Sequence, residues 1–216
     1  MKKIIFVIVA LIFSGCDKPA NNHFLTLDSV YLQLQTKQML DSQDPGISKA
    51  KEEAMALIQR AQLYNYQLID SRSLERAFDG FIVIATLPRG IYNLGLIPNA
   101  MHFEFTKSLS TNTDGSEWNW NQDAKGQSKE KFLEFLGEDK SAKIVFYDEG
   151  EDVFAPAGSA HTAILWAQHE GYTNLYRLVG GFGAWKALGL KTTKEVPLCC
   201  QIDAHDSKTH HTGHTH

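Results

Sequence analysis

The chain has 216 residues, of which 43% are hydrophobic and 21% charged, so it can bury a core of its own and matches about one domain. Its formal net charge is −4. This balance holds no excess of basic residues, which excludes DNA or RNA as a partner.

Residues 1–15 have the pattern of a bacterial secretion signal. Lys2 and Lys3 precede an uncharged apolar run over residues 4–13. A run of this length spans only about half of a bilayer core. It therefore predicts a signal peptide rather than a membrane-spanning helix.

Ser14-Gly15-Cys16 resembles the lipobox of bacterial lipoproteins, in which the cysteine becomes the lipidated first residue of the mature protein. Several acyl chains on Cys16 would anchor the chain stably, at about 0.8 kcal/mol for each buried CH₂. Asp17 resembles the signal that keeps a lipoprotein at the inner membrane. We therefore expect a lipid-anchored protein of the cell envelope, on the periplasmic face of the inner membrane. The alternatives are the outer membrane and an ordinary signal peptide with an incidental cysteine.

After a polar tether over residues 16–22, short apolar segments alternate with helix-like segments. A strand over residues 25–27 leads into a helix over 30–40. A second helix is predicted over residues 48–64, because the apolar positions 50, 54, 57, 58 and 61 share one face. The remaining predicted elements are strands at 66–70, 81–85, 143–147 and 175–179, a turn-rich segment at 96–102, a polar excursion at 106–127, and helices at 127–136, 159–170 and from about 184.

Apolar strands that alternate with helices are typical of a parallel sheet covered on both of its faces. The chain is therefore predicted to be of the α/β class. Residues 196–216 show no core-forming pattern and are predicted to form a tail rich in cysteine and histidine.

Three segments carry a resemblance to a known family. The longest is residues 171–190, GYTNLYRLVGGFGAWKALGL, and the others are residues 68–72, LIDSR, and residues 95–102, GLIPNAMH. In this order they resemble the rhodanese-like domain, which we assign to residues 23–195. The resemblance implies a five-stranded, mainly parallel sheet with helices on both faces. It also implies a catalytic cysteine at the end of the strand over residues 143–147.

The residue after this strand is Asp148 and not cysteine. Together with Glu149, Glu151 and Asp152 it places four carboxylates where the family carries a thiolate and an arginine. A carboxylate cannot carry sulfane sulfur, and an acidic loop repels anions such as thiosulfate. We therefore expect a domain without sulfurtransferase activity. Its expected role is that of a binding or accessory module, with a small ligand or an envelope protein as partner.

Other uses of these carboxylates stay open. The loop could hold a hard cation through oxygen ligands, or it could be a solvated acidic loop over the former pocket. Asp148 could also act as a helix cap or general base together with His161. The resemblance further implies that Asp70 and Arg72 form a structural pair beside the loop, where Arg72 is expected to neutralise a carboxylate rather than to bind substrate.

The tail holds seven residues of the types that bind Cu, Zn or Ni, namely Cys199, Cys200, His205, His210, His211, His214 and His216. Their spacing matches no defined zinc motif, so a solvated tail without a committed metal is the alternative. The two cysteines could instead be nucleophiles of a periplasmic sulfurtransferase, or form disulfides in that oxidising compartment. A metal-handling protein and a tail-cysteine sulfurtransferase are therefore the alternatives to the binding module.

Overall fold

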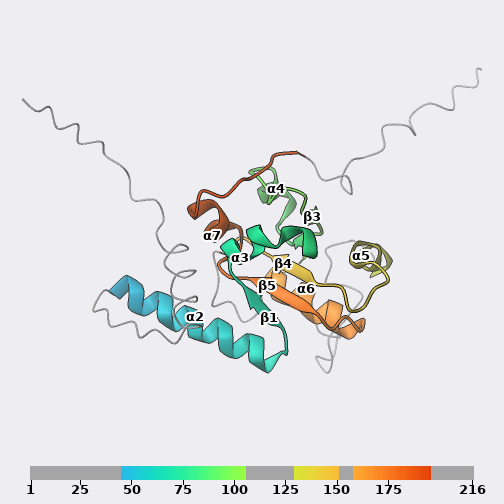
Figure 1. The fold of residues 1–216 in the computed structure, drawn as a ribbon, viewed down its shortest axis with the longest axis horizontal. Helices are drawn as coiled ribbons and strands as arrows, with labels where there is room; N and C mark the ends of the chain where they lie inside the picture. Colours follow the sequence, from blue (N-terminus) through green and yellow to red (C-terminus); the bar gives the residue numbers. More distant parts are fainter. Residues whose placement is uncertain (1–44, 106–128, 151–157, 196–216) are drawn as a thin grey trace, which may run out of the picture.

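The computed structural model describes residues 45–105, 129–150 and 158–195 (Figure 1). Within these ranges short strands alternate with helices, as the apolar pattern predicts. The predicted strand at 25–27, the helix at 30–40 and the excursion at 106–127 lie outside the described residues, as do Cys16 and the tail. In the three described ranges, no helix is both long enough and apolar enough to cross a membrane.

Five strands form one sheet in which every neighbouring pair is parallel. All four residues of the central strand β4 are buried. A strand covered on both faces reads as a continuous apolar run, which is why the sequence predicts it. The strands are β1 (Gln67–Ile69), β2 (Ile82–Ala85), β3 (Met101–His102), β4 (Ile144–Tyr147) and β5 (Leu175–Leu178), in the order β1-β5-β4-β2-β3. The sequence indicates β3 only as part of the turn-rich segment.

Helices cover both faces of the sheet, because successive residues of a strand point to opposite sides. Ile144 and Phe146 of β4 belong to a core that also contains residues of α5, α6 and the end of α2. Val145 and Tyr147 belong to a second core with residues of α3 and α7. The helices are α2 (Pro45–Leu63), α3 (Ser71–Arg76), α4 (Arg89–Tyr92), α5 (Lys129–Leu136), α6 (Ser159–His169) and α7 (Gly181–Ala187), with a 3₁₀ turn at Phe78–Gly80. The predicted five-stranded α/β fold with helices on both faces is confirmed.

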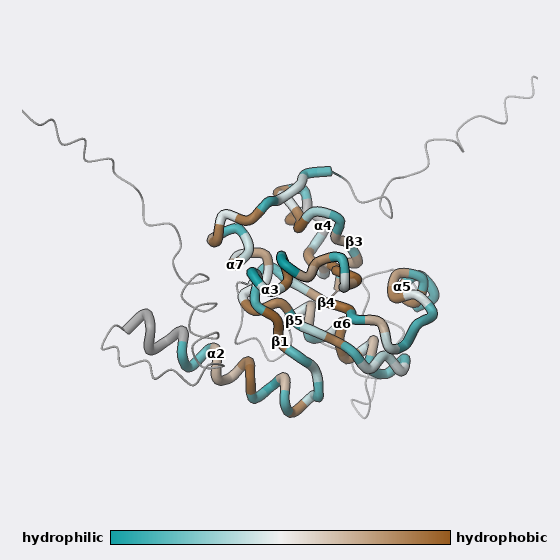
Figure 2. Tube along the Cα trace, in the orientation of Figure 1, coloured by the Kyte–Doolittle hydropathy of each residue, from teal (hydrophilic) through white to brown (hydrophobic). Residues whose placement is uncertain are grey.

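The buried face of α2 follows the predicted spacing. Ala54, Leu57 and Ala61 are buried, and apolar and polar residues alternate along the second half of the helix (Figure 2). The helix begins at Pro45, earlier than the predicted residue 48. Proline is favoured in the first turn, where its missing N–H removes no hydrogen bond.

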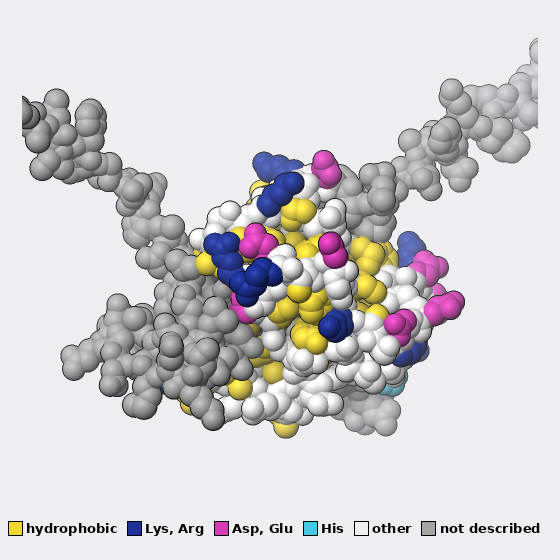
Figure 3. Space-filling model, in the orientation of Figure 1, with side chains coloured by type: hydrophobic (Ala, Val, Ile, Leu, Met, Phe, Trp, Pro, Cys, Tyr) yellow, Lys and Arg dark blue, Asp and Glu magenta, His cyan; other side chains and the backbone are white. Residues whose placement is uncertain are grey.

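The surface mixes charges of both signs. On the face shown in Figure 3, acidic and basic side chains lie around apolar side chains near the centre. This mixture agrees with the net charge of −4. On this face it differs from the continuous basic patch that binds nucleic acid.

Candidate functional site

The ends of β4 and β5 and the start of α6 meet at one edge of the sheet. Asp148 comes directly after β4, which ends at Tyr147. Gly158 is the N-cap residue of α6. Open parallel sheets bind their ligands outside the carboxyl ends of the strands. This edge is therefore the candidate site.

The carboxylate of Asp148 contacts one arginine and two backbone amides. Nη2 of Arg177, in β5, lies 3.0 Å from Oδ2 of Asp148. The N–H of Gly150 donates to Oδ1 at 3.2 Å, and the N–H of Ala160 donates to Oδ2 at 3.4 Å. Ala160 lies in the first turn of α6, where the helix dipole attracts an anion. The arginine and the helix therefore attract the same carboxylate.

The backbone after β4 is tied to the start of α7. The N–H of Phe182 donates to the carbonyl oxygen of Asp148 at 2.8 Å, and the N–H of Gly183 donates to that of Glu149 at 3.0 Å. A Cβ at Gly181 would collide with the carbonyl oxygen of Asp148, and the φ of 55° at this position also favours glycine. The close approach of two backbones therefore explains this glycine of the 171–190 segment. It also explains why α7 begins earlier than the predicted residue 184.

Gly158 leaves room for the ion pair. A Cβ at this position would lie 2.5 Å from Oδ2 of Asp148 and 2.6 Å from Nη2 of Arg177. Both distances are far below van der Waals contact. The pair therefore packs directly on the backbone that enters α6.

Arg177 is a charged residue inside the sheet. It is 3% exposed, and strand alternation places it on the same face of β5 as Leu175. Burial is the largest influence and lowers the pKa of Arg177, but the charge of Asp148, the phenol of Tyr66 and the contacts with both groups together outweigh it, so the pKa lies above its ordinary value. Removing one partner of such a pair leaves a buried charge without compensation.

His161 lies in the first turn of α6 and is 2% exposed. Its ring and the ring of Tyr64 form a T-shaped pair with centroids 4.7 Å apart, and its centroid lies 5.7 Å from that of the Tyr66 ring. Burial, followed by the charges of Arg177 and Arg60, lowers the pKa of His161 to about 3. The imidazole is therefore neutral at pH 7.

Three buried polar atoms gather beside the ion pair. Counting only described residues, Oη of Tyr66, Nδ1 of His161 and Nη1 of Arg177 have no hydrogen-bond partner. Burial raises the pKa of Tyr66, and the nearby charge of Arg177 acts against this rise. The guanidinium acts on the phenol by its charge and as a neighbouring donor, although neither Oη of Tyr66 nor Nη1 of Arg177 has a well-formed hydrogen bond to a described residue. Buried polar atoms are nearly always paired with protein, water or an ion, so this cluster is unusual.

Asp70 and Arg72 have local roles in α3. The carboxylate of Asp70 caps the helix by accepting from the N–H of Ser73 at 2.9 Å. The guanidinium of Arg72 is 48% exposed, forms an ion pair with Glu75 at 3.2 Å, and donates to the carbonyl oxygen of Leu188 at 3.3 Å.

The predicted neutralisation of the loop by Arg72 is wrong for Asp148. Arg177 pairs with the carboxylate of Asp148 instead. The strands β4 and β5 are neighbours, and their register places Arg177 beside Phe146, two residues before Asp148. The sequence holds one signal for this role, which is a charged residue in a strand that is otherwise apolar. Tyr66 carries no comparable signal, since an aromatic residue before a strand suits a core equally well.

The remaining predicted site residues are only partly described. Glu149 is half-buried, while Glu151, Asp152, Cys199, Cys200 and the five histidines of the tail lie outside the described residues. Among the residues that the structure does describe, no group of three or more acidic, histidine or cysteine side chains could hold a metal ion. The metal interpretations of the loop and tail therefore stay predictions. General-base chemistry by Asp148 with His161 also stays a prediction. The ion pair with Arg177 disfavours it, because the carboxylate of Asp148 is already bound.

The ion pair can be tested by a double-mutant cycle with Arg177→Met and Asp148→Asn. We expect Arg177→Met to lower the free energy of unfolding by about 3–5 kcal/mol, because Asp148 then keeps a buried charge without its partner. The double variant should regain much of this loss. Urea denaturation measures the free energy of unfolding of the single and double variants. Arg72→Met is the matched control, since the exposed ion pair of Arg72 with Glu75 contributes less than about 1 kcal/mol. Equal losses for Arg177→Met and Arg72→Met would contradict the assignment.

His161 should make stability depend on pH. Its pKa is lower in the folded chain than the ordinary 6.5, so its contribution is complete above pH 6.5 and is lost as the pH falls toward 3. The slope reaches at most about 1.4 kcal/mol per pH unit. We expect His161→Phe to flatten the urea-derived stability profile between pH 6.5 and 4. His169→Phe, which changes a more exposed ring, should keep the wild-type slope. Identical slopes for both variants would refute the role of His161.

Solved structures with related folds come from several organisms. A rhodanese-related protein from Thermoplasma volcanium is 15% identical, with a TM-score of 0.42, over 60% of this chain and 100% of its own. The Alr3790 protein from Anabaena sp. is 20% identical, with a TM-score of 0.38, over 60% of this chain and 81% of its own. A thiosulfate sulfurtransferase from Pseudomonas aeruginosa is 21% identical, with a TM-score of 0.40, over 61% of this chain and 20% of its own.

The family itself is identified from the sequence profile. No curated protein gives a match. The profile described as the rhodanese-like domain matches residues 52–188, which is more than half of the chain. With this match and a five-stranded parallel sheet between two layers of helices, the protein belongs to the rhodanese-like domain family.

Proposed function

We propose that this protein is a rhodanese-like binding or accessory module that does not transfer sulfur. The observation that carries the proposal is the environment of Asp148. This residue follows the central strand directly, and its carboxylate contacts Arg177 and the N–H groups of Gly150 and Ala160. A sulfurtransferase of this family would need a thiolate in that position.

The chemistry of the site supports the proposal. A persulfide intermediate needs a sulfur nucleophile whose thiolate is stabilised by backbone N–H groups and a helix N-terminus. Here two such N–H groups already donate to a carboxylate, which cannot form a bond to sulfane sulfur. The arginine that would attract an anionic sulfur donor is paired with the same carboxylate. Donor binding and the covalent step are therefore both disfavoured.

Loss of the transfer step leaves a domain that can still recognise a partner. The loop after β4 begins with Asp148 and Glu149 and continues with Glu151 and Asp152, so its charge favours a basic surface over an anionic donor. The partner in this proposal is an envelope protein or a small ligand that contacts this edge of the sheet.

A thiosulfate:cyanide sulfurtransferase assay tests the proposal. The purified full chain should show no turnover above a boiled control, whereas the Pseudomonas aeruginosa thiosulfate sulfurtransferase serves as the positive control. The double variant Cys199→Ser, Cys200→Ser is run in parallel with persulfide labelling. Turnover by the wild-type chain that persists in this variant would refute a non-catalytic domain, and labelling that disappears in it would favour a tail-cysteine sulfurtransferase.

The proposal includes a place in the cell envelope. It is supported by the lipobox-like Ser14-Gly15-Cys16 and by Asp17, which together favour lipidation of Cys16 and retention at the periplasmic face of the inner membrane. The cysteines and histidines of the tail would then face the periplasm, where Cu, Zn or Ni are the metals that suit them.

Membrane fractionation tests the anchor. Wild-type chain expressed in a bacterium is expected in the membrane fraction, and Cys16→Ser is expected to lose this association because no thiol remains to carry the acyl chains. Cys199→Ser is the matched control and should stay with the membrane. Equal membrane association of the Cys16→Ser variant and the wild type would contradict lipid anchoring.

A further inference from the structure

Tyr66, His161 and Arg177 come from three different segments and meet on one face of the sheet. Tyr66 directly precedes β1, His161 belongs to α6, and Arg177 belongs to β5. All three side chains are buried. Each has a polar atom without a hydrogen-bond partner in the described part of the chain, namely Oη, Nδ1 and Nη1.

The three side chains are neighbours. The rings of Tyr66 and His161 have centroids 5.7 Å apart. Arg177 lies close enough to Tyr66 to act on the phenol by its charge and as a neighbouring donor, and its charge also acts on His161. Nη2 of Arg177 is used by Asp148 at 3.0 Å, so Nη1 is the part of the guanidinium that is left for another group.

The cluster consists of groups that can donate. A guanidinium only donates, a phenol hydroxyl can donate, and a neutral imidazole donates from the nitrogen that carries its proton. A ligand that accepts hydrogen bonds from all three side chains at once would have to be small and carry oxygen acceptors. Oxygen acceptors on a small planar group are what a carboxylate or bicarbonate offers.

Two arginines act electrostatically on the cluster. Arg177 and Arg60 are the charged residues that act on His161, and both lower its pKa. The same two arginines act on Tyr66, where Asp148 is the acidic residue that opposes them. Asp148 is itself neutralised by Arg177. Glu53 is also buried on α2 and has contacts of its own.

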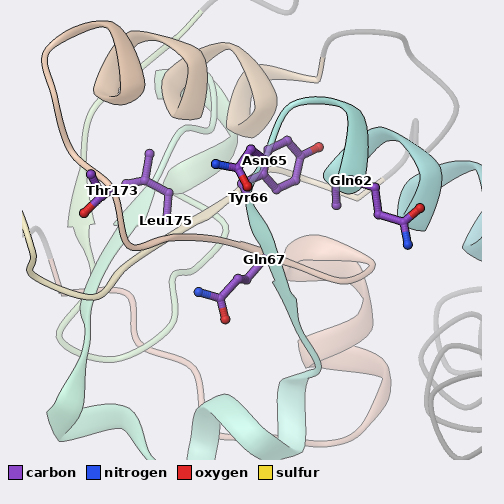
Figure 4. A pocket seen from close by; sticks show the side chains of 7 residues that line it. Gln62, Asn65, Tyr66, Gln67, Thr173 and Leu175 are labelled. Carbon is purple, nitrogen blue, oxygen red and sulfur yellow. The ribbon is translucent and has the colours of Figure 1, made fainter.

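A route from solvent reaches Tyr66. A cavity of about 390 Å³ lies between the end of α2 and the starts of β1 and β5, and Tyr66 forms part of its wall. Figure 4 shows its ring beside Asn65 and Gln62, with Gln67 below it. The cavity therefore brings solvent to the ring of Tyr66 from the side of α2, while His161 and Arg177 do not line it.

We propose that Tyr66, His161 and Arg177 form a buried binding site for one small oxyanion, of the carboxylate or bicarbonate class. The site lies beside the Asp148 ion pair and uses the half of the guanidinium that this pair leaves. It rests on the proposed binding role of the domain and gives that role a ligand class.

Formate is the probe, and thermal unfolding and calorimetric titration of the full chain are the measurements. Sodium chloride at equal ionic strength is the reference. We expect formate to raise the melting temperature above this reference and to bind with a single affinity. Tyr66→Phe should weaken binding about tenfold, because it removes one hydrogen bond to a charged ligand. Without formate it should be at least as stable as the wild type, since it removes an unpaired hydroxyl.

Tyr64→Phe is the matched control. The ring of Tyr64 contacts the ring of His161, but the hydroxyl of Tyr64 is not part of the cluster. The formate affinity of Tyr64→Phe should therefore stay within about a factor of two of the wild-type affinity. The ring ¹⁵N signals of His161, identified by their absence in His161→Phe, should shift with formate at the same affinity.

The outcomes separate this site from the function above. No response beyond chloride, or an equal response in Tyr66→Phe and the wild type, would overturn the oxyanion site. If Tyr66→Phe fails to fold, the His161 signals in the wild type and in Tyr64→Phe decide the matter alone. Sulfurtransferase turnover together with a normal formate response would overturn the proposed function and leave the site intact.

Discussion

The salt bridge between Asp148 and Arg177 joins the central strand to its neighbour at 3.0 Å, with both side chains largely withdrawn from solvent. The backbone that enters α6 packs directly on this pair, because a Cβ at Gly158 would collide with both charged groups. The backbone of Asp148 also accepts a hydrogen bond from Phe182 at the start of α7. Two helices and two strands are therefore positioned around one pair of charges.

Burying two charges costs desolvation energy, and such a pair is retained only where geometry and further hydrogen bonds compensate. Asp148 has this compensation from two backbone N–H groups, one of them in the first turn of α6. The backbone N–H groups at the end of β4 thus already bind the carboxylate of Asp148. In the proposed function this occupation replaces sulfur chemistry, because the amides and the arginine serve a carboxylate that cannot act as the sulfur nucleophile.

Arg177 links this pair to the polar cluster on its other side. Nη2 of its guanidinium contacts Asp148, and Nη1 has no hydrogen-bond partner among the described residues, while Tyr66 and His161 are neighbours of the same side chain. Burial, together with the charges of Arg177 and Arg60, lowers the pKa of His161 and keeps the imidazole neutral. A single buried arginine therefore contacts both the end of the central strand and the polar cluster, and both proposed roles of the domain depend on it.

Much of the fold could be predicted from local pattern. Burial of one helix face or of a whole strand leaves a period or a run in the sequence, so α2, α5, α6, β2 and β4 were accessible, as was the position of Asp148 after β4. The family motifs placed the Gly180 and Gly181 turn, whose backbone must approach the loop closely. The start of α7 and the short strand β3 were less accessible, because both depend on contacts with other segments.

The partners of Asp148 could not be predicted in the same way. Arg177 is 29 positions away along the chain, and it reaches the carboxylate only because β4 and β5 pair in parallel with Phe146 beside Arg177. Arg72 is the nearer candidate by family analogy, yet it points to the exposed side of α3. Tyr66 and His161 meet only when α6 and the end of α2 pack on the same face of the sheet. Periodicity records which residues are buried, whereas contacts between distant residues leave no period, so their pairing is decided by the three-dimensional packing of the strands and helices.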